Sequence, residues 1–220
     1  MYKKYSKIST IREVAVAVRF LGIFDTVGAF GIPVEIGFGF QKINLFKDLT
    51  VSANVKTVVH CVSIDENRKP FIPTLCNQAR NVSEVWFAGV HADIGGYGHP
   101  QLGRIPLSYM LGRLDKTFSN NRVAFDKVKL SQLTDYNLGV DEFHLHYHGD
   151  GIVKKRRDIV VLKDGENSGN KPAIHSSVFN LMDSKKLILS TTFDGFAKIE
   201  AIRYMPKSIT GLMGNFALIE

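Results

Sequence analysis

The chain has 220 residues, of which 45% are hydrophobic and 22% are charged, and its formal net charge at pH 7 is +7. This balance excludes a disordered chain and suits a single domain over residues 1–220. No apolar run reaches the roughly 18–20 residues that span a bilayer, and the short apolar start, interrupted by Glu13, predicts no secretory leader. The two cysteines, Cys61 and Cys76, form no disulfide or CxxC pattern and fit synthesis in the cytoplasm.

Positive charge gathers near the start of the chain and in a run of four cations at residues 154–157. Anionic lipid or nucleic acid can bind such patches. However, no zinc-finger spacing or basic stripe interleaved with aromatic residues accompanies them. We therefore predict solvated surface at both patches and no nucleic-acid partner. The cations are Lys3, Lys4, Lys7, Arg12, Lys154, Lys155, Arg156 and Arg157.

The first half of the chain contains three apolar segments. Residues 14–24 are rich in valine and isoleucine, which predicts a strand buried on both faces of a parallel sheet. Residues 53–66 place valines at roughly helical spacing and predict a helix, and residues 83–90 predict a second buried strand. A strand, a helical crossover and a strand predict a right-handed βαβ unit in which the two strands are central neighbours.

The second half begins with a helical pattern over residues 105–118, in which leucines and a methionine form one stripe. Residues 143–151 alternate like a strand that ends in a turn, and residues 156–170 predict a short strand and a polar loop. Residues 185–195 and 197–205 predict further strands. These elements together predict an α/β fold, with a mostly parallel sheet and flanking helices.

Each of the two predicted central strands ends in an aspartate-bearing loop. Asp25 stands in FDTVG and Asp93 in HADIGG. Sites in open α/β sheets gather at the carboxyl ends of strands, where glycines let the chain turn sharply and let a substrate come close. We expect both aspartates at the same sheet edge. Each is either a site carboxylate that orients a histidine or a cap of its own loop.

The histidines offer several candidates. His91 stands two residues before Asp93, so the two share a face if the segment is extended. His60 lies in the predicted helix and is expected to be packed and hydrogen-bonded. His175 follows a polar loop, a position that suits a mobile triad histidine. Three histidines of one predicted strand face form either a polar surface, which we favour, or a metal site; these are His144, His146 and His148.

Four segments in chain order carry a family resemblance: residues 20–33 (FLGIFDTVGAFGIP), 58–75 (VVHCVSIDENRKPFIPTL), 84–98 (EVWFAGVHADIGGYG) and 173–178 (AIHSSV). Over roughly residues 18–180 the chain resembles an α/β-hydrolase family that includes phospholipase effectors of type VI secretion. The resemblance implies a serine esterase that acts on phospholipid, with no cofactor and no metal.

The resemblance also implies roles for individual residues. Asp93 would be the triad acid and His175 the triad base, while Asp25 would line the site or serve as the alternative acid. Residues of the loop after the strand would bind substrate; these are His91, Gly95 and Gly96. The sequence reads GGYG after Asp93, where the family more often has three glycines.

The sequence departs from the family in the nucleophile. Family members carry an elbow of the form GFSRGA upstream of the first segment, but this sequence contains no GxSxG. In this fold the triad serine precedes the acid and the histidine. We therefore expect the C-terminal part of an α/β-hydrolase domain, without its N-terminal strands and nucleophile elbow, and inactive alone.

The expected partners follow from this interpretation. They are a lipid or membrane surface as substrate, together with the N-terminal half of the same enzyme or a component of type VI secretion. The chain would be made in the cytoplasm and exported without a signal peptide. Two alternatives stay open: a non-catalytic binding module that uses an exposed sheet edge, and a metal-dependent enzyme that uses the three clustered histidines with an aspartate.

Overall fold

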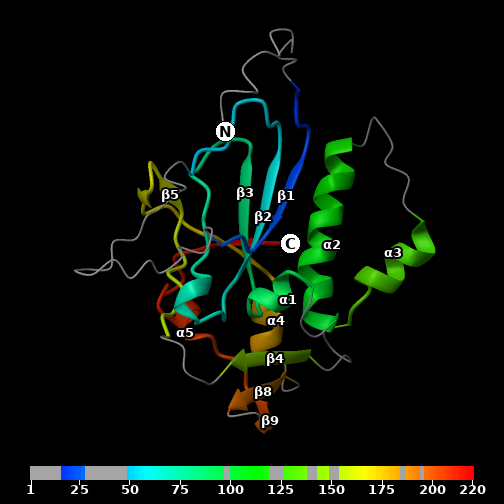
Figure 1. Cartoon of the computed structure of the whole chain (residues 1–220), viewed down its shortest axis with the longest axis vertical. Coiled ribbons are helices and arrows are strands. Elements are labelled where there is room, and N and C mark those ends of the chain that lie inside the picture. Colours follow the sequence, from blue (N-terminus) through cyan, green and yellow to red (C-terminus); the bar gives the residue numbers. More distant parts are fainter. Residues whose placement is uncertain are drawn as a thin grey trace, which may run out of the picture.

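The structure, a computed structural model, centres on one parallel five-stranded sheet with the strand order β1-β2-β3-β7-β10. Figure 1 shows β1, β2 and β3 side by side. Its strands are β1 (Leu21–Phe24), β2 (Val58–Ser63), β3 (Val82–Phe87), β7 (Ala173–His175) and β10 (Ala217–Ile219). The predicted mostly parallel sheet is confirmed. The residues described are 16–27, 49–96, 100–118, 126–137, 143–148, 154–183, 187–193 and 196–220.

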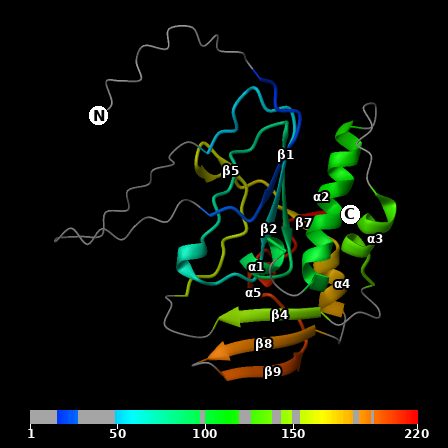
Figure 2. The ribbon, with the colours of Figure 1, turned by 45° about the vertical axis from the view of Figure 1, so that its right-hand side comes forward.

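A second, smaller sheet lies beyond one end of the first, where β4 and β8 run parallel and β8 and β9 antiparallel (Figure 2). Its strands are β4 (Phe143–His148), β8 (Leu187–Phe193) and β9 (Phe196–Ile202), which confirms the strands predicted in these three segments. The short strands β5 (Leu162–Lys163) and β6 (Glu166–Asn167) form a hairpin.

The helices flank the main sheet. They are α1 (His91–Ile94), α2 (Pro100–Phe118), α3 (Lys127–Thr134), α4 (Ser177–Asp183) and α5 (Lys207–Thr210), with a 3-10 turn η1 at Lys69–Phe71. The helix predicted over residues 105–118 is confirmed as part of α2. Its buried side includes Leu102, Ile105 and Met110, whereas Leu107 and Leu111 of the predicted stripe are only partly buried.

The helix predicted over residues 53–66 is wrong. This segment contains β2, whose six residues are all buried, between β1 and β3. Valines on both faces of a central strand also match helical spacing, and their β-branched side chains favour the strand. The predicted βαβ unit is therefore wrong as well, because β1 and β3 are not neighbours and residues 64–81 contain η1 as their only helical turn.

The strand predicted over residues 14–24 is shorter than expected and lies at the sheet edge. Only Leu21–Phe24 form β1, and Leu21 is 37% exposed. Burial on both faces was therefore wrong for this strand in the described chain; residues 14–15 lie outside the described part. The two strand ends nevertheless meet at one edge of the sheet, because β1, β2 and β3 run parallel.

Candidate functional site

Asp25 immediately follows β1, and its backbone has a φ of +42°. The left-handed region is costly for a residue with a side chain, by about 1–3 kcal/mol, and such strain is concentrated at functional sites. The backbone N–H of Asp25 donates to the carbonyl of Cys61 at 2.7 Å, which fixes this turn to the end of β2. The turn places the Asp25 carboxylate in the interior, where it is fully buried.

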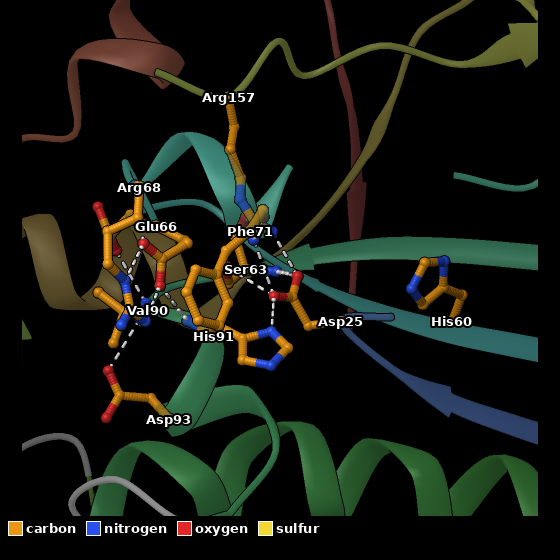
Figure 3. Close-up of polar contacts among 12 residues, drawn as sticks. Asp25, His60, Ser63, Glu66, Arg68, Phe71, Val90, His91, Asp93 and Arg157 are labelled. Carbon is orange, nitrogen blue, oxygen red and sulfur yellow. Dashed lines mark hydrogen bonds and ion pairs between the residues drawn. The ribbon is translucent and has the colours of Figure 1, made fainter. Parts of the chain in front are cut away.

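The carboxylate of Asp25 is held by groups from three other segments (Figure 3). The backbone N–H of Ser63 donates to Oδ1 at 2.8 Å, and Nη2 of Arg157 donates to Oδ2 at 2.9 Å. Nη1 of Arg157 also binds Oδ1, so the guanidinium engages both oxygens. The ring Nδ1 of His91 lies 2.7 Å from Oδ2. A fully buried carboxylate thus joins the ends of β1 and β2 to a histidine and an arginine.

Burial alone would raise the pKa of Asp25, because it removes the carboxylate from water. Hydrogen bonds from His91 and Arg157, the charge of Arg157 and the amide of Ser63 outweigh that effect and lower the pKa of Asp25 below its ordinary value. Asp25 is therefore an anion at neutral pH. An anion in this position can fix the tautomer of the neighbouring imidazole and stabilise its protonated form.

Arg157 corrects the prediction that residues 154–157 are solvated surface. The first three cations of the run are exposed, but the side chain of Arg157 is 2% exposed. Beyond Asp25, its guanidinium donates to the carbonyls of Ser63 at 3.1 Å and Phe71 at 2.6 Å. Arg157 thus fixes the carboxylate from the side opposite His91. The basic residues near the start of the chain lie outside the described part.

His91 is the first residue of α1, directly after the turn that follows β3. Its side chain is 30% exposed, and its ring lies 5.0 Å from the ring of Phe71, centroid to centroid. Its backbone N–H donates to Glu66 at 3.3 Å. When Nδ1–H donates to Asp25, the other ring nitrogen, Nε2, carries a lone pair that can accept a proton. His91 and Asp93 both belong to α1, so the condition under which they would share a face, an extended segment, is not met.

The loop after β2 supports the His91 ring through three residues in contact with one another: Glu66, Arg68 and Phe71. Glu66 is buried and accepts from Nε and Nη2 of Arg68 at 2.9 and 2.7 Å. The Arg68 guanidinium in turn lies 3.8 Å from the centre of the Phe71 ring, in cation–π contact. This arrangement fixes the orientation of the ring against which His91 packs.

Asp93 is fully buried, and its Oδ2 accepts the N–H of Val90 at 2.8 Å. This contact caps the first turn of α1, which is the structural alternative predicted for this aspartate.

Nearby Asp65 accepts from the N–H of Gly89 at 2.8 Å and from the hydroxyl of Tyr204 at 2.7 Å. Burial, and to a smaller extent the charge of Asp93, raise the pKa of Asp65 to about 7.

His175 ends β7 and lies in an apolar environment. Its Nδ1 is 2.8 Å from Oγ of Ser177, and its ring stacks on Phe87 with centroids 4.7 Å apart. Burial lowers the pKa of His175 to about 4, so the ring is neutral at physiological pH. In the described part of the chain its ring contacts Ser177, Phe87 and Tyr109. The predicted hydrogen bond to Asp93 stays a prediction.

Gly95 and Gly96 form the exposed turn that ends α1. Gly95 donates to the carbonyl of His91 at 3.0 Å, and Gly96 adopts a φ of +80°. Their predicted role in substrate binding stays a prediction, as do the triad roles given to Asp93 and His175. Of the three clustered histidines, the side chains of His146 and His148 lie outside the described part.

Sequence reasoning missed several residues of this site, and one error accounts for most of them. The helix predicted over residues 53–66 conceals a third strand end at the sheet edge, the carboxyl end of β2. Ser63, Asp65 and Glu66 all lie at that end. Read as a buried strand followed by a polar loop, VVHCVSIDE would have placed them beside Asp25.

The family model of the "T6SS, Phospholipase effector Tle1-like, catalytic domain" matches residues 2–113, just over half of the 220 residues. The chain belongs to this family. No characterised protein and no solved structure gives a significant match. Both members of the Asp25–His91 pair lie within the segment matched by the Tle1-like family, whereas Arg157 and His175 lie outside it. In the described residues of this Tle1-like chain, no helix has the length and apolarity to cross a membrane.

Proposed function

We propose that this chain supplies the acid and the base of a serine esterase that cleaves ester bonds of phospholipids, with Asp25 as the acid and His91 as the base. The observation that carries the proposal is the 2.7 Å contact between Nδ1 of His91 and the fully buried, ionised Asp25. The partial exposure of the His91 side chain supports it, because a triad base must reach substrate from one ring nitrogen.

In the proposed reaction, a serine hydroxyl attacks the ester carbonyl while Nε2 of His91 accepts the hydroxyl proton. Asp25 holds the Nδ1–H tautomer and stabilises the imidazolium. The tetrahedral intermediate then collapses, and His91 returns the proton to the departing alcohol. A water molecule then attacks the acyl-serine, again with His91 as the base, which releases the fatty acid and frees the serine. The serine belongs to a GxSxG elbow, which this sequence does not contain.

Arg157 would act as a positioning residue in this mechanism. It binds both carboxylate oxygens of Asp25, so the carboxylate has one orientation toward His91. Arg157 and the imidazolium of His91 would both interact with the single negative charge of Asp25. Arg157 therefore fixes the orientation of the carboxylate at the cost of weaker stabilisation of the imidazolium. In this proposal Asp93 and His175 have structural roles in place of the triad roles that the resemblance implies. Asp93 caps α1, and His175 packs on Phe87.

The outer side of the edge strand β1 is a suitable place for a segment that carries the nucleophilic serine. In the described chain β1 pairs with β2 alone and leaves its other side open, beside Asp25. Val16 and Leu21 are 66% and 37% exposed near this edge. A further strand that adds here would deliver its following turn to the region of Asp25 and His91. The same open edge supports the second candidate function, a binding module that pairs with a partner strand.

The family supports a bilayer as the substrate and the type VI secretion apparatus as the route of export. The test joins this chain to a GFSRGA-bearing segment of a family member and measures fatty-acid release from phospholipid vesicles, together with labelling by a fluorophosphonate serine probe. We expect turnover and labelling of the elbow serine in the joined protein, and neither in the chain alone. Labelling of Ser176 or Ser177 in the chain alone would contradict the proposal.

A further inference from the structure

A second cluster of reactive side chains lies within the main sheet, apart from the Asp25–His91 pair. It consists of His60 on β2, Glu84 on β3 and Cys76 in the loop between them. Figure 3 shows His60 set apart from the residues that surround Asp25. The mechanism proposed above uses none of the three residues, and they offer three different donor atoms: an imidazole nitrogen, a thiol sulfur and a carboxylate oxygen.

We propose that His60, Cys76 and Glu84 bind one transition-metal ion of the zinc class, with a fourth coordination position open to a neighbouring pocket. The fold itself brings the donors together. His60 and Glu84 are directly opposite each other in the parallel register of β2 and β3, and Nδ1 of His60 lies 2.9 Å from Oε2 of Glu84. The backbone N–H of Cys76 donates to the same oxygen at 3.0 Å, which holds the cysteine beside the pair.

The spacing of the donor atoms suits a small tetrahedral ion. The three ligand atoms all lie within 4.8 Å of one another. Bonds of about 2.0–2.3 Å to zinc place tetrahedral ligands roughly 3–4 Å apart. The cluster therefore reaches ligating geometry through side-chain adjustments of about 1 Å, without movement of the strands.

Burial and charge also favour an ion at this place. His60 is fully buried, and its Nδ1, which faces Glu84, is the ring nitrogen that would bind the ion. The carboxylate of Glu84 and a thiolate at Cys76 together carry the two negative charges that neutralise a divalent cation. Burial, followed by the charge of Glu84, raises the pKa of the Cys76 thiol to about 11, so an ion would have to displace that proton.

A pocket of about 320 Å³ adjoins the cluster, and both Cys76 and Glu84 line it. Two cations, Arg113 and Lys171, line it as well. Three protein ligands with an open fourth position are typical of zinc sites that bind an exchangeable ligand. The two cations favour an anionic group, such as a carboxylate or phosphate, as that ligand. This site shares no residue with the histidine row of β4, where the sequence suggested a metal alternative.

The test is a titration of the full chain with Co²⁺, followed by competition with Zn²⁺. We expect one equivalent of Co²⁺ to bind with a thiolate-to-cobalt charge-transfer band in the near ultraviolet, and Zn²⁺ to abolish that band. Cys76→Ser should remove the band and weaken binding by about tenfold or more. Glu84→Gln should weaken binding while the band persists at saturating Co²⁺.

Two control variants separate this site from other binding. Cys61→Ala removes the other cysteine, and His144→Gln removes a histidine of the β4 row; both should leave the band and the stoichiometry unchanged. Absence of Co²⁺ binding to the folded chain overturns the proposal, as does a band that survives Cys76→Ser. The readout needs no esterase activity, so its failure is distinct from failure of the proposed function.

Discussion

His91 and His175 lie at equivalent places in the sheet and in different chemical surroundings. His91 follows β3 and His175 ends β7, at the carboxyl ends of two paired parallel strands. The Nδ1 of His91 contacts an ionised carboxylate, and its side chain is 30% exposed. The Nδ1 of His175 contacts a serine hydroxyl, its ring stacks on Phe87, and the residue is 7% exposed.

The comparison teaches that the position of a histidine in a motif does not determine its role. A base needs a carboxylate on one ring nitrogen and access to substrate on the other. His91 has a carboxylate on Nδ1, and its partial exposure allows Nε2 to reach a substrate. Burial lowers the pKa of His175 to about 4, so its ring is neutral at physiological pH. Four predictions test this difference.

The largest effect is expected on turnover. In the chain joined to a serine elbow, His91→Gln should lower turnover by about 10⁴–10⁶-fold, the range typical of losing a triad member. His175→Gln should lower it by less than about tenfold, because its ring lies among packed side chains. Fatty-acid release at saturating substrate, with circular dichroism as the folding control, measures both. A larger loss for His175→Gln than for His91→Gln would reverse the assignment.

The second prediction concerns the buried ion pair that holds the carboxylate beside His91. Asp25→Asn should destabilise the fold by about 3–5 kcal/mol, because it leaves the buried charge of Arg157 without its partner. Lys155 and Asp158 form a matched control pair nearby, with side chains 54% and 75% exposed. Lys155→Ala should change the free energy of unfolding by less than about 1 kcal/mol. Urea unfolding of both variants measures the contrast, and equal effects would count against a structural role for Arg157.

The parts of the fold that the sequence predicts are those with an unambiguous pattern. Strand β3, helix α2 and the two aspartates at one sheet edge follow from apolar runs, a helical stripe and the loops after the strands. Strand β2 does not, because its valines satisfy helical spacing as well as a strand buried on both faces. Only its neighbours β1 and β3 decide between the two, and that is tertiary information.

The site shows the same limit more sharply. Asp25 and His91 are each conspicuous in the sequence, but they are 66 residues apart, and the family resemblance implied Asp93 and His175 as the acid and the base instead. Arg157 is 132 residues from Asp25 and is the last of four successive cations. Nothing in that run distinguishes the one that turns inward from the three that stay exposed.

The third prediction tests the turn that presents His91. Gly89 has a φ of +122°, and a Cβ there would lie 2.8 Å from Cβ of Asp93. Gly89→Ala should therefore destabilise the fold by about 2–3 kcal/mol and displace α1 with His91. Gly112 in α2 has nothing within 4 Å of such a Cβ, so Gly112→Ala should stabilise by up to about 1 kcal/mol. Thermal unfolding compares the two alanine variants, and a harmless Gly89→Ala would show that the turn tolerates a side chain.

The smallest effect expected is on the pH dependence of stability, and it tests whether His175 is held neutral. The pKa of His175 is lowered from 6.5 to about 4 in the folded chain. Between these values the unfolded chain binds more protons at this residue, so the contribution of His175 makes stability rise with pH. His175→Gln removes that contribution. The free energy of unfolding of the variant should rise less between about pH 4 and 6.5 than that of the parent, by on the order of 1–3 kcal/mol.

Asp65 contributes to the pH dependence of stability with the opposite sign, over a pH range that overlaps that of His175. Burial raises its pKa from 3.8 to about 7, so the folded chain binds more protons there between these values, and the contribution of Asp65 makes stability fall as the pH rises. Asp65→Asn should therefore make the free energy of unfolding rise more steeply with pH, whereas His175→Gln flattens it. Urea unfolding at several pH values between about 4 and 7 gives both slopes. If His175→Gln makes the slope steeper, as Asp65→Asn is expected to do, then His175 is not held neutral by burial, and the contrast with His91 loses its electrostatic basis.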